Sequence, residues 1–212
     1  NMVRVGGTSS QTIENMTYSE LQQFDYGSWM DSRFAGTPLC TFDNAVKVCK
    51  LLGLKIYIDC KGIQTVQEFR DAAAIVDRWG MHDEVFWGAT LFQNCWDAIP
   101  DAKIIFAAGG KLTGSTWEGA DGWFTNLPAM YPDKATEIDG VWKFNDDVYF
   151  GVVNTYTLMN DQTYGIEGLQ TEAIKAEKYN IKYGLYAVDD VETIYTLCSS
   201  IPYMQYMEGN KI

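Results

Sequence analysis

The feature that most constrains the fold of this chain is a repeated alternation of short apolar stretches with helical patterns. The apolar stretches are rich in Ile, Val, Tyr or Phe and predict six strands, at Lys55–Lys61, Glu84–Ala89, Lys103–Gly109, Val148–Asn154, Lys182–Asp189 and Tyr203–Glu208. Strands that alternate with helices favour a mainly parallel sheet covered by helices, which is an α/β fold. The alternation alone does not distinguish an open doubly wound sheet from a closed barrel.

Side chains that can cap the amino end of a helix indicate where helices begin. They occur at five places, namely Thr17, Thr41, Thr65, Thr171 and Asp190. Thr65 and Glu68 have the spacing of a capping box, in which each side chain accepts a hydrogen bond from an otherwise unpaired amide. Gly53 and Gly80 follow apolar residues at helical spacing and are expected to end two of these helices.

Two stretches do not follow the alternation. Residues 1–39 contain only the short capped turn at Thr17, and residues 109–147 form a long segment with several glycines and tryptophans. A connection of that length in a compact domain is more often functional than idle. Its aromatic side chains would either stack on a ligand or pack the segment against the mouth of a barrel. We expect one domain over residues 1–212, with an insertion at about 109–147.

Length and charge exclude several classes of protein. A chain of 212 residues can bury a sizeable core. Its 16 basic and 28 acidic residues give a net charge of −12 without a basic cluster, so we expect no nucleic-acid partner. No stretch has the length of a transmembrane helix. The five dispersed cysteines indicate mostly buried free thiols but do not distinguish a cytoplasmic from a secreted protein, and the oligomeric state is not indicated.

The stretch Lys55–Lys61 carries the clearest candidate site. Alternation along a strand puts Ile56, Ile58 and Cys60 on one face and places Asp59 and Lys61 together on the other. In α/β folds ligands bind at the carboxyl ends of the strands. A carboxylate there can hold a hard cation, and an ammonium can neutralise a phosphoryl oxygen. The alternative is a simple ion pair at the end of the strand.

Several motifs resemble those of glycerophosphodiester phosphodiesterases, whose pattern is roughly T-x-x-E-L, D-x-G and F-x-G-x-x-I-P-T-L-x-E, followed by a strand ending E-I-K. The matching residues are Thr17-Tyr18-Ser19-Glu20-Leu21, Phe24-Asp25-Tyr26-Gly27-Ser28-Trp29, Phe34-Ala35-Gly36, Pro38-Leu39, Thr41-Phe42 and Ile58-Asp59-Cys60-Lys61. Near the carboxyl terminus, Tyr186-Ala187-Val188-Asp189-Asp190 is similar to the family's W-T-V-N strand end. The resemblance extends from about Thr12 to the end of the chain.

The resemblance implies a TIM-type (β/α) barrel that hydrolyses glycerophosphodiesters to glycerol 3-phosphate and an alcohol. It implies a small-molecule phosphodiester substrate and a divalent cation, Ca²⁺ or Mg²⁺. Asp59 takes the place of the metal-binding carboxylate, although it is one methylene shorter than the family's Glu. Lys61 takes the place of the catalytic lysine that contacts the phosphate, and Tyr186 takes the place of the tryptophan that lines the substrate pocket.

The family's H-R-G, E-L-D and H-D motifs have no match in these 212 residues. These motifs supply the catalytic histidines and further metal ligands. The single histidine, His82, precedes a predicted strand and is expected at the opposite rim, where residues serve stability. The resemblance therefore predicts a barrel that lacks its N-terminal strands and is inactive by itself. The alternatives are a non-catalytic barrel that serves as a binding module, and a phospholipase D or sphingomyelinase-type enzyme on the same fold.

Overall fold

The protein has a mixed α/β fold, seen here in a computed structural model that describes residues 2–108, 123–155, 159–160, 162, 165–186, 188 and 190–207. A six-stranded sheet is its centre, with the strand order β1-β2-β3-β6-β7-β8 and parallel pairing throughout. The strands are β1 (Ile56–Asp59), β2 (Val85–Gly88), β3 (Ile104–Ala107), β6 (Phe150–Thr155), β7 (Lys182–Tyr186) and β8 (Met204–Met207). All six predicted strands and their parallel arrangement are confirmed.

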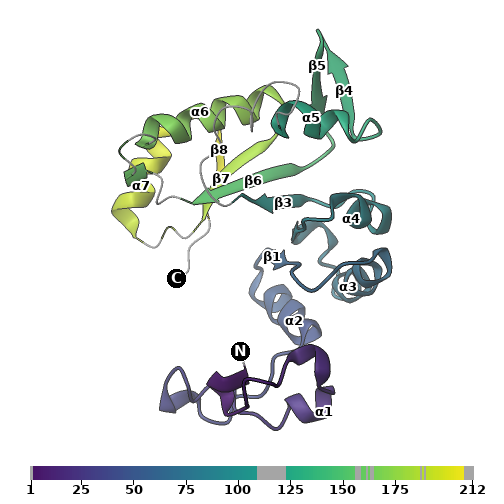
Figure 1. The fold of residues 1–212 in the computed structure, drawn as a ribbon, viewed down its shortest axis with the longest axis vertical. Helices are drawn as coiled ribbons and strands as arrows, with labels where there is room; N and C mark the ends of the chain where they lie inside the picture. The colour runs from purple at the N-terminus through teal and green to yellow at the C-terminus, as the bar shows by residue number, and fades with distance from the viewer. Residues whose placement is uncertain are drawn as a thin grey trace.

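Helices cover one face of this sheet (Figure 1). They are α2 (Phe42–Leu52), α3 (Val66–Arg78), α4 (Phe92–Ala98), α6 (Gly165–Lys178) and α7 (Val191–Ser200). The core lies between helices and sheet, where Phe69 of α3, Ile104 of β3 and Leu197 of α7 are fully buried. Burial of such a side chain stabilises the fold by about 1.5–3 kcal/mol.

The strands are staggered along the curved sheet. The strand pairing aligns Asp59 of β1 with Gly88 of β2, Ile105 of β3, Gly151 of β6 and Lys182 of β7. β7 continues to Tyr186, four residues further, over four steps between neighbouring strands. Among the described strands β1 and β8 are the two edges, so these strands do not close the barrel.

Most of the predicted helix starts are confirmed. The side chains of Thr17, Thr41, Thr65 and Asp190 each accept a hydrogen bond from a backbone amide of the helix that follows. The prediction at Thr171 is wrong, because α6 begins at Gly165. Thr171 lies inside that helix and donates its hydroxyl to the carbonyl of Glu167 at 2.8 Å.

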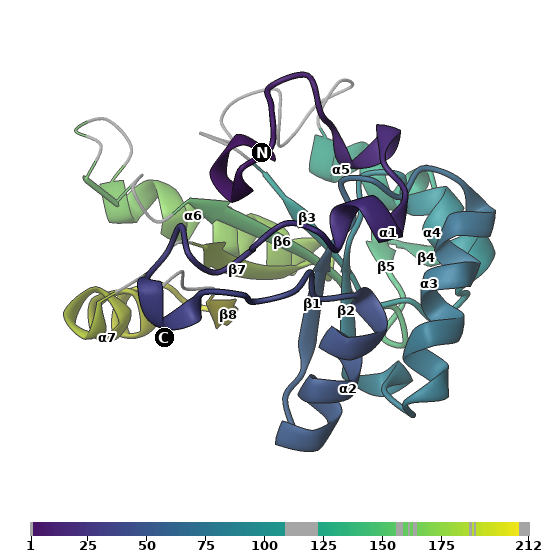
Figure 2. The same ribbon diagram turned by 90° about the horizontal axis from the view of Figure 1, so that it is seen from below.

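Residues 2–41, named the first segment below, contain three short 3₁₀ turns and one turn of helix before α2. They are η1 (Met2–Val5), η2 (Ile13–Asn15), α1 (Tyr18–Leu21) and η3 (Ser32–Phe34). Because α2 ends directly before β1 begins, the amino end of α2 lies toward the carboxyl ends of the strands. Figure 2 shows the first segment (purple) on the side of that amino end.

The long segment after β3 contains regular structure that sequence reasoning did not predict. Residues 109–122 lie outside the described part, and α5 (Trp123–Ala129) is followed by a hairpin of β4 (Ala135–Ile138) and β5 (Val141–Phe144). Asp139 and Gly140 connect the two strands, both with positive φ, as a two-residue type I′ turn requires.

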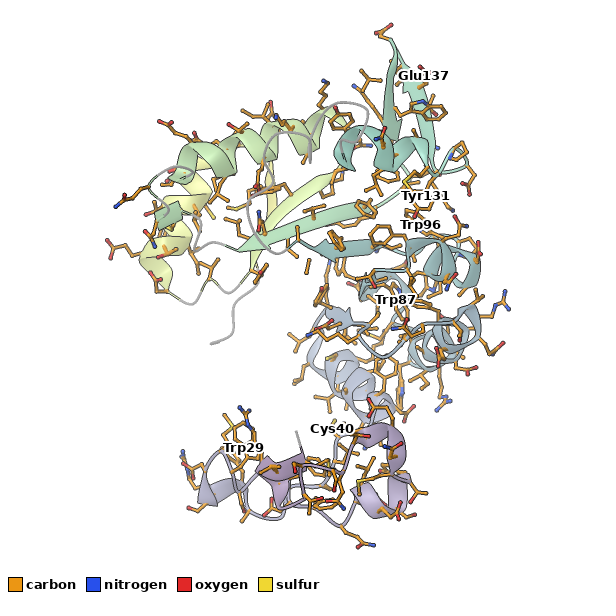
Figure 3. The ribbon with its side chains drawn as sticks, in the orientation of Figure 1. Trp29, Cys40, Trp87, Trp96, Tyr131 and Glu137 are labelled. Atoms are coloured by element: carbon orange, nitrogen blue, oxygen red, sulfur yellow. The ribbon has the colours of Figure 1, made fainter. Side chains whose placement is uncertain are left out.

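The described half of this segment packs on the helical side of the sheet. Tyr131 contacts Trp96 of α4, with ring centroids 5.0 Å apart (Figure 3). Phe144 lies 6.1 Å from Trp96 between ring centroids and stacks on Phe150 of β6. Trp142 is partly buried against the same core. Trp142 therefore packs the segment, but on the helical side of the sheet and not at a barrel mouth as predicted. Lys134 Nζ donates to the carbonyl of Pro100 in the loop before β3, which places this part of the segment toward the amino ends of the strands.

The described residues include no helix that is long and apolar enough to cross a membrane. All five cysteines are free thiols. The expectation that most of them are buried is wrong, because only Cys60 and Cys95 are buried, Cys49 is partly buried, and Cys40 and Cys198 are exposed.

Candidate functional site

The candidate site lies at the carboxyl end of β1. Asp59 is the last residue of the strand, and the amide of Lys61 donates to the carbonyl of Asp59 at 2.9 Å, which forms a tight turn. Lys61 Nζ lies 2.8 Å from Asp59 Oδ2. The Lys61 side chain is 87% exposed and that of Asp59 is 52% exposed, so a solute can reach both groups. The hydrogen bond to Asp59, and then its negative charge, raise the pKa of Lys61, which keeps the ammonium charged at neutral pH.

Sequence reasoning did not assign to the site two residues that lie beside Asp59 on β1 and β2. Tyr57 lies two residues before Asp59 on the same face of β1, and Gly88 is the β2 partner of Asp59. A Cβ on Gly88 would lie 2.5 Å from the Tyr57 hydroxyl, so only glycine lets the phenol rest across β2. The available signal was the glycine itself, because a glycine inside a strand often marks a close approach.

Cys60 separates the two charged residues in sequence and points the other way. Its side chain is buried in the core with Phe69 and Cys95, as the strand alternation predicts. Burial, and then the nearby charge of Asp59, raise the pKa of the Cys60 thiol to about 12. The thiol therefore stays protonated and is not a nucleophile of the site.

Tyr186 ends β7 and shares a face with Asp59. The pairing aligns Asp59 with Lys182 of β7. Tyr186 follows Lys182 by four residues on β7 and therefore points to the same face. The phenol is partly buried. Three strands separate β1 from β7, which corresponds to roughly 19 Å along the curved sheet. The structure thus puts the three predicted residues on one face and at one edge, with Asp59 and Lys61 in contact and Tyr186 across the sheet.

His82 lies at the opposite rim, as predicted. It begins the 3₁₀ turn η4 (His82–Glu84) that leads into β2, so it is at the amino ends of the strands. Its Nδ1 lies 3.0 Å from Asp77, and its Nε2 lies 2.9 Å from Asp101. The hydrogen bond with Asp101 is the main cause that raises its pKa, and that with Asp77 adds to it. The ring is thus a connector between α3 and the loop before β3.

The described residues offer few ligands for a metal ion. Asp59 supplies one carboxylate, which Lys61 already contacts. Among the residues that the structure describes, no group of three or more His, Cys, Asp or Glu side chains could hold a metal ion. A Ca²⁺ ion takes 6–8 oxygen ligands and Mg²⁺ takes an octahedral set. These side chains alone therefore do not form a divalent-cation site, and we derive no chemical step through a metal.

Comparisons with known proteins connect this fold to one group of enzymes. No family profile matches the sequence, and no curated protein matches it. Among solved structures, the chain is similar to a glycerophosphodiester phosphodiesterase from Agrobacterium tumefaciens str. C58, with a TM-score of 0.60 and 16% identity over 95% of this chain and 71% of that one.

A second similar structure, from Silicibacter pomeroyi DSS-3, is assigned as a glycerophosphoryl diester phosphodiesterase. The TM-score is 0.59 and the identity 12%, over 95% of this chain and 67% of that one. Identities this low establish the fold and not the activity. The resemblance predicted from the motifs is confirmed at that level: the chain has the α/β fold of the glycerophosphodiester phosphodiesterases.

Proposed function

We propose that the carboxyl edge of the sheet binds a phosphodiester and belongs to an enzyme that hydrolyses glycerophosphodiesters to glycerol 3-phosphate and an alcohol. One observation carries the proposal. Asp59 and Lys61 form an exposed pair at the carboxyl end of β1, at the edge where α/β folds bind their ligands. The fold that the chain shares with such enzymes supports the same function.

Lys61 is the group that we assign to the phosphate. Its ammonium is charged at neutral pH and can contact a phosphoryl oxygen while negative charge develops there. Hydrolysis joins the oxygen of water to phosphorus and breaks the bond between phosphorus and the alcohol oxygen, which takes up a proton. Because the Lys61 ammonium stabilises mainly the transition state of this bond exchange, its loss should lower turnover more than substrate binding.

Asp59 and a divalent cation form the second part of the proposal. Together with further oxygen ligands that the described residues do not supply, the Asp59 carboxylate would be one ligand of Ca²⁺ or Mg²⁺, an ion whose charge would suit the phosphoryl oxygens. Local positive charge matters here because the chain as a whole carries a net charge of −12 and repels an anionic substrate at long range.

Tyr186 is proposed to line the pocket for the rest of the substrate. Its place at the end of β7, on the face of Asp59, permits contact with a ligand that extends across the sheet. A phenol offers both an apolar ring and a hydroxyl, which suits a glycerol moiety.

A non-catalytic binding module is the second candidate, and one observation favours it. The single histidine of these 212 residues lies at the amino rim, so this chain brings no imidazole to the carboxyl edge for acid–base chemistry. Such a module would bind a phosphodiester at Lys61 without cleaving it.

A coupled assay for released glycerol 3-phosphate tests these alternatives. We expect residues 1–212 to show no turnover above background with Ca²⁺ or Mg²⁺. A longer chain with a preceding segment that carries H-R-G, E-L-D and H-D should be active. In that longer chain Lys61→Ala should lower kcat about 100-fold or more, with a smaller change in KM, because the charge acts in the transition state.

The matched control is Lys55→Ala, which removes an exposed ammonium from the other end of the same strand. It should leave kcat within about twofold, as expected for a surface group. Metal-dependent turnover by residues 1–212 would show that the catalytic groups are misplaced. An inactive longer chain that still binds glycerol 3-phosphate would favour the binding module.

A further inference from the structure

A loop before α2 has a construction that the proposed site does not explain. Residues 25–37, named loop 25–37 below, return to their starting point. The amide of Tyr26 donates to the carbonyl of Thr37 at 2.9 Å, and the amide of Gly36 donates to Asp25 Oδ2 at 2.9 Å. Gly27 fits only without a side chain, because a Cβ there would lie 1.9 Å from the carbonyl oxygen of Phe34. The loop is therefore compact and held at both ends.

Most backbone amides of loop 25–37 find their acceptors within the loop. Ten of the twelve backbone amides of residues 26–37 donate to acceptors in the loop. The Asp25 carboxylate accepts bonds from the amides of Gly36, Gly27 and Ser28, which hold its pKa well below the usual range. The indole N–H of Trp29 donates to the carbonyl of Tyr26 at 2.9 Å. Transfer of such groups from water costs little, because a satisfied hydrogen bond avoids most of the desolvation penalty.

Three apolar side chains of the loop face solvent beside polar ones such as Arg33. Trp29, Met30 and Phe34 are 52%, 71% and 46% exposed. Figure 3 shows Trp29 projecting from the ribbon of the first segment. A compact loop of fixed shape thus presents three large apolar side chains to solvent together.

The charges of the loop cancel. Arg33 forms two hydrogen bonds with Asp31, at 3.0 and 3.1 Å, and the guanidinium of Arg4 lies 5.3 Å from the centre of the Trp29 ring. With Arg4 included, two guanidinium groups balance the carboxylates of Asp25 and Asp31. A neutral, dipolar surface with an exposed indole matches zwitterionic headgroups above an apolar layer. The net charge of −12 opposes approach to an anionic membrane.

We propose that loop 25–37 docks the protein on a zwitterionic lipid surface, into which Trp29, Met30 and Phe34 insert. The loop leads within five residues into the amino end of α2, which lies toward the carboxyl edge of the sheet. Docking through it brings that edge toward the lipid layer. The inference does not depend on the proposed hydrolysis, since it concerns binding alone.

Co-sedimentation of the 212-residue protein with phosphatidylcholine vesicles tests the proposal. The protein should pellet with the vesicles, and the double variant Trp29→Ser/Met30→Ser should lower the partition coefficient about tenfold or more, since two apolar side chains lose their burial. Replacing a third of the lipid by phosphatidylglycerol should weaken binding of the unchanged protein. Met30→Ser alone, at the most exposed of the three positions, should lower the partition coefficient severalfold and guards against misfolding of the double variant.

The matched control is Leu51→Ser/Leu52→Ser on α2, where two apolar side chains are 75% and 65% exposed. This control should leave vesicle binding unchanged. The proposal is overturned if the unchanged protein stays in the supernatant, or if both double variants lose binding equally, which indicates general apolar adhesion. It is also overturned if Trp29→Ser/Met30→Ser abolishes concentration-dependent self-association in sedimentation velocity, because the loop would then be a protein interface.

Discussion

The two faces of the sheet hold carboxylates in opposite settings. On the face opposite the helices, Asp59 at the carboxyl end of β1 is about half exposed and forms an ion pair with the exposed Lys61. On the helical face Glu172 of α6 is 1% exposed and accepts bonds from Asn154 of β6, at 3.0 and 3.1 Å, and from the hydroxyl of Tyr183 of β7 at 2.5 Å. One carboxylate is therefore available to a solute, whereas the other joins two strands to a helix.

This difference separates stability from chemistry within one sheet. A buried carboxylate is costly unless it is fully hydrogen-bonded, so Glu172 and its partners depend on one another. An exposed ion pair such as Asp59–Lys61 contributes little to folding. Changes on the helical face should therefore lower the free energy of unfolding, and changes at the carboxyl edge should alter ligand binding with little effect on stability.

The largest effect is expected at Glu172. Glu172→Ala removes the shared acceptor and leaves Asn154 and Tyr183 buried without it, so the free energy of unfolding should fall by about 3 kcal/mol or more. Urea unfolding monitored by circular dichroism measures this. A loss below about 1 kcal/mol would mean that the two faces do not differ as described.

A smaller loss is expected at Tyr183. Tyr183→Phe keeps the ring and removes one hydrogen bond to Glu172, which should cost about 1–2 kcal/mol. Tyr195→Phe is the matched control, because Tyr195 is 73% exposed on α7. This variant should unfold at the same urea concentration as the unchanged protein. Equal shifts in both variants would argue against a specific role of the buried bond.

The pH dependence of stability tests a further pair of carboxylates, Asp77 and Asp101, which contact His82 at the amino rim. Its raised pKa means that the charged imidazole stabilises the fold fully below the unfolded value of about 6.5. This contribution is lost as pH rises through the higher folded pKa. Because the His82 side chain is 41% exposed, we expect only a few tenths of a kcal/mol.

Melting temperatures of the unchanged protein and of His82→Asn from pH 5 to pH 9 measure this contribution. The difference between the two proteins should be largest at the acidic end and shrink toward the alkaline end. A difference that grows with pH would contradict the assigned ion pairs.

The smallest effect on stability is expected at Asp59. Asp59→Asn should change the free energy of unfolding by less than about 0.5 kcal/mol, because the lost pair with Lys61 is solvent-exposed. Equilibrium unfolding in urea measures this directly. A loss comparable to that of Tyr183→Phe would place Asp59 among the structural residues.

Much of the fold could be predicted from local signals. Caps such as Thr41 and Thr65 act through hydrogen bonds to residues three positions away, so the sequence shows them directly. The faces of β1 followed from alternation, with Cys60 inside and Asp59 outside. The motif at Phe24–Trp29 and Phe34–Gly36 corresponds to a real structural unit, because Asp25 closes loop 25–37.

The remaining features depend on contacts that are distant in sequence. A glutamate is rarely fully buried, so nothing in α6 marks Glu172 until Asn154 and Tyr183 are brought to it. α4 was not predicted from a cap, and the structure shows no capping hydrogen bond from the side chain of Leu91. The turn Asp139-Gly140 was a usable hairpin signal, but the surrounding glycines and tryptophans obscured it.

The most direct test of the proposed site is an NMR titration of the 212-residue protein with glycerol 3-phosphate. Backbone amide shifts should change at Asp59–Gly62 and at the carboxyl end of β7, and Lys61→Ala should weaken binding about tenfold, as expected for loss of one charged contact. Shift changes confined to the amino rim near His82, or no saturable binding, would contradict the account.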